Sequence, residues 1–237
     1  MSHIHIPDGI LHPIVWISGY VLTAIVLFFI LRNIKGDEIR KKIPITALMA
    51  AVMLIAMSVP LGFIPVHLSL AVVVGIVLGP RLGFLAILTV NLMLALIGHG
   101  GMTIVGLNTI IIGAEMFLGY ALFRLLRKKI RISVSAFCSA FLALLFSLSL
   151  MTGILVTSIS VPQALSSYVT HEHDDHEEHE EEEHEDEWLE DLSFLGISGL
   201  AALAVIVLAG LLLESLATGL IIGFLVKARP DILGEAG

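Results

Sequence analysis

Long apolar runs separated by short polar or glycine-rich breaks fill most of the chain. Seven of these runs are long enough to cross, or nearly cross, a bilayer as helices. The runs fall at residues 12–31, 44–62, 67–80, 82–98, 104–124, 132–160 and 197–226. The pattern predicts an all-α integral membrane protein of about seven transmembrane helices, forming a single bundle over residues 1–237.

Basic residues predict how these helices are oriented. With seven spans, all thirteen lysines and arginines fall on one side, after the first, third, fifth and seventh spans. Loops rich in lysine and arginine face the cytoplasm, which places the N-terminus outside and the C-terminus inside. All ten histidines fall on the opposite, outer side: His3, His5, His12, His67, His99, His171, His173, His176, His179 and His184.

The composition agrees with lipid as the main solvent. Apolar residues make up 57% of the chain and charged residues only 14%, against about 25% in soluble domains. A soluble protein of this size could not bury so much apolar surface, so we expect a multi-pass protein of the cell membrane. Fourteen of the 21 acidic residues lie within residues 172–191. This one insert therefore accounts for the negative net charge of −8. No nucleic-acid partner is expected.

The first residues have the chemistry of a metal-binding segment. A free α-amine followed closely by a histidine can bind a metal through the amine, the intervening amide nitrogens and the imidazole. This set of nitrogens favours a square-planar ion such as Ni²⁺ or Cu²⁺. Removal of Met1 would leave the amine on Ser2 beside His3, and in an extended segment His3 and His5 would share a face. Residues 1–11 are therefore predicted to form an outer metal-binding segment; an exposed tail with idle histidines is the alternative.

His67 is a second candidate ligand. It follows Pro65 and opens the third apolar run, which is short and ends at Gly79-Pro80. Nonhelical backbone with an ionisable side chain at membrane depth indicates a functional site. The alternative is a histidine satisfied by a nearby carbonyl or hydroxyl, such as that of Ser69.

Other polar residues are candidates for a supporting layer behind the ligands. His99 stands among three glycines, which indicates a tight loop, and Asn108 follows shortly after it. Glu115 and Glu214 lie inside predicted spans, where an acid costs a few kcal/mol unless it is paired or hydrated. Each must be protonated, bonded to a hydroxyl or amide, or face a polar pocket. We assign His99, Asn108 and Glu115 as possible supporting residues and expect that either acid could tune the site.

An acidic, histidine-rich insert separates the last two spans. It contains fourteen acids and five histidines and has no lysine or arginine. Such a composition cannot fold alone, so residues 170–192 are predicted to be a disordered outer loop. The loop would collect dilute cations weakly, although a simple solvated polyanion is the alternative. Its histidines are His171, His173, His176, His179 and His184.

Several motifs together resemble a known family. The opening Ile4-His5-Ile6-Pro7-Asp8-Gly9 is similar to the Met-His-Ile-Pro-Asp-Gly start of the substrate-binding membrane component (CbiM/NikM type) of energy-coupling factor transporters for cobalt and nickel. Also similar are His67 at the head of the third run, Leu78-Gly79-Pro80, and His99-Gly100-Gly101-Met102-Thr103 followed by Gly106-Leu107-Asn108. The match is good over residues 1–125; beyond them it is mainly one of topology.

The resemblance implies a ligand set and partners. In the family, the N-terminal amine, the second-position histidine and a histidine after span 2 hold Ni²⁺ or Co²⁺. The last of these corresponds to His67. The N-terminal histidine corresponds to His5 by motif, and to His3, with the amine of Ser2, by distance from a processed terminus. The partners implied are a pair of ATPase subunits, a coupling membrane subunit and a small accessory membrane protein.

Two other classes of function are alternatives to a metal-capture subunit. A self-contained metal channel or exchanger would need a polar path, which Glu115 and Glu214 alone could line. An intramembrane enzyme would need a catalytic set, and the sequence contains no zinc-peptidase pattern, nucleophile elbow or nucleotide site. A non-catalytic subunit without a catalytic cofactor is therefore expected. Ni²⁺ or Co²⁺ would be its cargo, with Cu²⁺ and Zn²⁺ as further possibilities.

Overall fold

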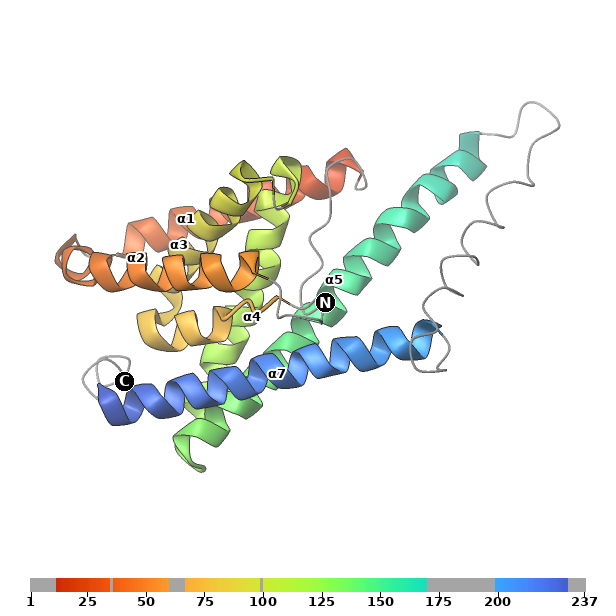
Figure 1. Cartoon of the computed structure of the whole chain (residues 1–237). Helices are drawn as coiled ribbons and strands as arrows, with labels where there is room; N and C mark the ends of the chain where they lie inside the picture. The colour runs from red at the N-terminus through yellow and green to blue at the C-terminus, as the bar shows by residue number, and fades with distance from the viewer. Residues whose placement is uncertain (1–11, 35, 60–66, 99, 170–198, 230–237) are drawn as a thin grey trace.

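The computed structural model of the chain describes residues 12–34, 36–59, 67–98, 100–169 and 199–229 (Figure 1). Within these residues the secondary structure is entirely helical, which confirms the predicted all-α class. In chain order the helices are α1 (Pro13–Asn33), α2 (Gly36–Ser58), α3 (Ala71–Leu96), the 3₁₀ helix η1 (Met102–Ile104), α4 (Val105–Leu126), α5 (Ile132–Val169) and α7 (Gly199–Ala228).

Two helices extend well beyond the apolar runs that predicted them. Helix α2 begins at Gly36 and continues through Pro44, where the predicted run only starts. Helix α5 continues to Val169, past the predicted end at residue 160. Hydropathy marks the part of a helix that lipid can cover, whereas the helix itself continues for as long as its backbone bonds persist.

Five helical segments are long and apolar enough to cross a membrane, and the apolar part of α2, Lys42–Ser58, is shorter. This confirms a multi-pass membrane protein. The third and fourth predicted runs lie within the single element α3, on either side of a kink. The count of seven crossings stays a prediction.

The kink in α3 lies at the predicted Gly79-Pro80 break. Gly79 has φ 78° and ψ 168°, a conformation in which a Cβ atom would clash with the backbone. Pro80 follows at the start of the next helical turns, where its missing N–H costs nothing. The guanidinium of Arg81 donates from Nη1 to the carbonyl of Asn33 at 3.2 Å, which ties the kink to the end of α1.

Helix α3 is the centre of the structure and α1 is its rim. In the most apolar window of α3, 72% of the residues are buried, against 17% in α1. Large apolar side chains of α1 are exposed, including Ile14 at 70% and Phe28 at 60%. In water this surface would be costly, so it fits a lipid environment.

Small residues allow α3 and α4 to pack closely. A Cβ atom on Gly75 would lie 2.7 Å from Cγ of Met116, and one on Gly119 would lie 2.6 Å from Cγ2 of Val72. Glycine facing a larger side chain is a common way for membrane helices to approach one another. A buried hydrogen bond from Nδ2 of Asn91 to the hydroxyl of Thr109, 3.2 Å long, joins the same two helices.

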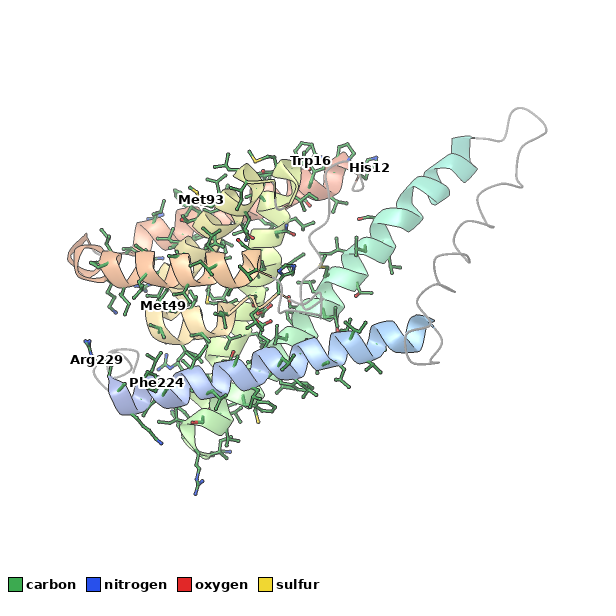
Figure 2. The ribbon with its side chains drawn as sticks, viewed as in Figure 1. His12, Trp16, Met49, Met93, Phe224 and Arg229 are labelled. Carbon is green, nitrogen blue, oxygen red and sulfur yellow. The ribbon has the colours of Figure 1, made fainter. Side chains whose placement is uncertain are left out.

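The remaining helices extend outward from this pair. α2 packs on α3, α1 packs on α4, α5 packs on α4, and α7 lies along α5. Figure 2 shows His12, before α1, and Arg229, after α7, on opposite sides of the helical bundle.

Candidate functional site

His67 is the one predicted metal ligand that lies in the described part of the chain. It is half-buried and stands just before the first turn of the central helix α3. Ser2, His3 and His5 lie outside the described residues. Their approach to His67 therefore stays a prediction.

The backbone between His67 and α3 takes an unusual conformation. Leu70, at the N-cap of α3, has φ 53° and ψ 17°, which is left-handed. For a residue with a Cβ this conformation costs about 1–2 kcal/mol relative to the right-handed one. Leu70 is also buried, with 5% of its surface exposed. Other contacts must therefore hold this turn in place.

Glu214 of α7 supplies those contacts. Its Oε1 atom accepts a hydrogen bond from the backbone N–H of Ser69 at 2.9 Å and another from the N–H of Leu70 at 3.0 Å. The hydroxyl of Ser69 donates to the same oxygen at 2.5 Å. Three donors from the segment that follows His67 thus converge on one oxygen of a side chain that is only 2% exposed.

Glu115 of α4 reaches the same hydroxyl. Ser69 Oγ lies 3.0 Å from Oε1 of Glu115, a residue with no exposed surface, and accepts from the N–H of Ala71 at 3.2 Å. We call Ser69, Glu115 and Glu214 the carboxyl junction. The expectation that the in-span acids bond to a hydroxyl is confirmed for both of them.

A second contact region fixes the start of α1 against α4. The hydroxyl of Tyr20 donates to the carbonyl of Met102, and that of Thr23 donates to the carbonyl of Gly106 at 2.8 Å. Gly98 ends α3 with φ 77°, a turn that glycine adopts readily. The first turns of α1 therefore lie at the end of the bundle where α3 leads into η1.

The supporting residues predicted from the sequence are only partly placed. Asn108 is half-buried on α4, seven residues before Glu115 and so on the same helix face two turns away. His99 lies outside the described residues. So do the insert histidines His171, His173, His176, His179 and His184. A supporting role for His99, Asn108 and Glu115 stays a prediction.

Within the described ranges, no three histidine, cysteine, aspartate or glutamate side chains are grouped closely enough to hold a metal ion. The sequence pointed to both glutamates, because an acid in lipid needs a partner. It did not pair them with Ser69, since the contact between Ser69 and Glu214 joins residues 145 positions apart.

These features define a class of protein. The chain is a multi-pass helical membrane protein in which an ionisable residue precedes a central broken helix and buried polar groups lie directly behind it. Membrane proteins use such arrangements to hold polar or charged solutes. Residues 5–232 match the family described as "CbiM: Cobalt uptake substrate-specific transmembrane region", and the chain belongs to this family.

Two relatives are named "Putative metal transport protein". The one from Haloquadratum walsbyi is 32% identical over 148 residues, covering 60% of this chain and 67% of the relative. The one from Haemophilus influenzae is 28% identical over 122 residues, covering 51% of this chain and 57% of the relative.

Two crystal structures share the fold. A transition metal transporter aligns with a TM-score of 0.63 over 98% of this chain and 97% of its own, at 19% identity. A truncated transition metal transporter aligns with a TM-score of 0.61 over 96% of this chain and 99% of its own, at 18% identity. Similarity at this level of identity concerns the fold alone.

Proposed function

We propose that the chain is the substrate-capture subunit of an uptake transporter for Ni²⁺ or Co²⁺. The observation that carries this proposal is the placement of His67. The histidine precedes the most deeply buried helix, and the residues after it are hydrogen-bonded to two other helices. A ligand held in this way is pre-organised for a small cation. The cobalt-uptake family supports the same class of cargo.

The proposed ligands are His67, the amine of Ser2 or of the unprocessed terminus, and His3 or His5. All of them donate nitrogen, which suits late first-row divalent ions. The general affinity order for such ions places Cu²⁺ and Ni²⁺ above Co²⁺, so Cu²⁺ would compete in vitro.

The proposed orientation has seven crossings, with the N-terminus outside and the C-terminus in the cytoplasm. The kink at Gly79 divides α3 at the boundary between the third and fourth predicted runs. The placement of His12 and Arg229 on opposite sides of the helical bundle supports the predicted separation of histidines from basic residues across the membrane. The ion would then arrive from outside at the end where α1 starts.

Energy for uptake would come from partners. The sequence carries no nucleotide site, so we propose ATPase subunits, a coupling membrane subunit and a small accessory membrane subunit as partners. A self-contained channel or exchanger is less well supported. The acids that could line its path, Glu115 and Glu214, are buried and bonded to Ser69 instead.

Reconstitution tests this division of labour. In sealed proteoliposomes the chain alone should bind radioactive ⁶³Ni²⁺ at its outer face without accumulating it in the lumen. Accumulation should appear when the ATPase and coupling subunits are added with ATP, and should vanish when the ATPase is inactivated. Luminal accumulation driven by the chain alone would show that it is a channel or exchanger.

Removing residues 171–187 should impair the collection of dilute cations without impairing binding at the main site. The segment carries five histidines and most of the acids, so it raises the local cation concentration without forming the main site. We expect lower uptake at scarce metal and an unchanged dissociation constant of the main site, measured by equilibrium dialysis. A deletion variant that loses the main site would show that the insert supplies essential ligands.

A further inference from the structure

We propose that Glu214 is a positioning residue for His67: its carboxylate, on α7, holds the turn that presents this histidine to the metal ion. The inference rests on the proposed function, because it concerns the same site. It assigns to α7 a part in metal binding that neither the spacing of the histidines nor the N-terminal motif indicates.

The first argument is the way that the hydrogen bonds converge. One oxygen, Oε1 of Glu214, accepts from the N–H of Ser69, the N–H of Leu70 and the hydroxyl of Ser69. Two successive backbone donors that point at one atom fix the peptide plane between them. His67 lies two residues before Ser69, so a change in this plane would move its imidazole.

The second argument is the strain in the same turn. Leu70 keeps a left-handed backbone although it has a side chain, and its N–H is one of the donors to Glu214. Without an acceptor at that position the turn could relax toward an ordinary conformation. Glu214 therefore stabilises the backbone that His67 needs, and it does so without contributing a metal ligand.

The third argument is the location of the acceptor. Helix α7 packs mainly along α5 and contacts α3 far less extensively. The bonds from Ser69 and Leu70 to Glu214 are therefore a principal link between α7 and the entry to α3. A rotation of α7 that withdrew Oε1 would disturb the turn at Ser69 and Leu70, and through it His67.

Glu115 differs from Glu214 in one respect that matters here. It meets the turn through the hydroxyl of Ser69, whereas the backbone N–H groups of Ser69 and Leu70 both donate to Glu214. Loss of this carboxyl leaves both backbone bonds to Glu214 in place. Glu115→Gln should therefore affect metal binding less than shortening Glu214 does.

Two substitutions at position 214 distinguish the effect of side-chain length from the effect of side-chain charge. Glu214→Gln keeps the length of the side chain and a carbonyl oxygen that can accept both backbone N–H groups, but it removes the charge. Glu214→Asp keeps the charge but withdraws the oxygens by one methylene. The measurement is the dissociation constant of Ni²⁺ for the purified full-length protein in nanodiscs, together with the visible d–d absorption of the bound ion.

If Glu214 positions the turn, Glu214→Gln should bind Ni²⁺ nearly as tightly as the wild type and show the same spectrum. Glu214→Asp should bind Ni²⁺ about 10–100-fold more weakly and show a shifted d–d band. This is the range of affinity loss found when groups that orient metal ligands are removed. Ser215→Ala is the matched control on α7. Its hydroxyl is buried but bonds the carbonyl of Leu211 in its own helix, so binding should not change.

Failure of the positioning role and failure of the proposed function would give different results. If Glu214→Asp binds Ni²⁺ as tightly as wild type, the positioning role is wrong. It is also wrong if Glu214→Gln binds as weakly as Glu214→Asp. In both cases the proposed site stands as long as His67→Ala still weakens binding by at least about 100-fold. If the wild type binds no Ni²⁺, or His67→Ala binds as tightly as wild type, the proposed function is wrong and the positioning role falls with it. Because both variants keep a polar side chain of similar volume, the comparison does not depend on an alanine variant that fails to fold.

Discussion

Replacing His67 with alanine is expected to weaken Ni²⁺ and Co²⁺ binding by at least about 100-fold. Loss of a group that merely orients a ligand already costs about 10–100-fold, and His67 is proposed as a ligand itself. The residues that follow His67 keep their bonds to Glu214 and Glu115 in the variant, so the bundle should fold normally. Isothermal titration of detergent-purified protein with Ni²⁺, Co²⁺, Cu²⁺ and Zn²⁺ measures the effect.

His12→Asn is the matched control for this substitution. His12 caps α1 by accepting a hydrogen bond from the N–H of Ile14 at 3.4 Å, and asparagine is also a good cap. A histidine is thus removed near the start of α1 without loss of a proposed ligand, and affinity should be retained. His3→Ala and His5→Ala, tested on protein with a determined N-terminus, show which of the two completes the site. If none of the three alanine variants weakens binding, the proposed site is wrong.

Gly106→Val is expected to destabilise the protein by more than about 2 kcal/mol. A Cβ at this position would lie 2.6 Å from the backbone nitrogen of Tyr20 and 2.7 Å from its Cα. Extra atoms in a packed interior usually cost about 1–3 kcal/mol, and backbone cannot move aside as a flexible side chain can. The crossing of α1 and α4 would open, and the bond from Thr23 to the carbonyl of Gly106 would lengthen. Thermal unfolding in detergent, followed by circular dichroism, measures the loss.

Gly153→Ala provides the comparison. Gly153 lies in α5, and a Cβ added there has no atom within 4 Å. Alanine at this site should leave the melting temperature unchanged or raise it slightly, because alanine is the better helix former. Equal melting temperatures for Gly106→Val and wild type would contradict the close crossing of α1 and α4.

The sequence predicted the helices well because their signals are local. Apolar runs, the Gly79-Pro80 break and the predicted all-α class all depend on neighbouring residues. The lengths of α2 and α5 were underestimated because hydropathy does not register helical turns outside the apolar part. Glycines such as Gly19 and Gly106 look like ordinary members of an apolar run. Only the three-dimensional packing shows that their missing side chains let two backbones meet.

The sequence signals for the candidate site differ in strength, for a related reason. His67 stands out as a candidate because an ionisable residue beside prolines in an apolar run is unusual. Glu214 could be recognised as needing a partner, but the energetic cost of a buried acid does not say which residue compensates for it. That information depends on how α7 lies relative to α3, which no short sequence pattern encodes. The left-handed Leu70 was unexpected for the same reason, since leucine carries no preference for that conformation.

X-ray absorption spectroscopy of Ni²⁺ bound to the full-length protein tests the central claim most directly. With the proposed ligands, the spectrum of the wild type should show nitrogen donors only, including two imidazoles. The spectrum of His67→Ala, recorded at a metal concentration that still loads the protein, should show one imidazole fewer. Identical imidazole counts in the two proteins, or a shell of oxygen donors, would contradict metal capture by His67 and the N-terminal segment.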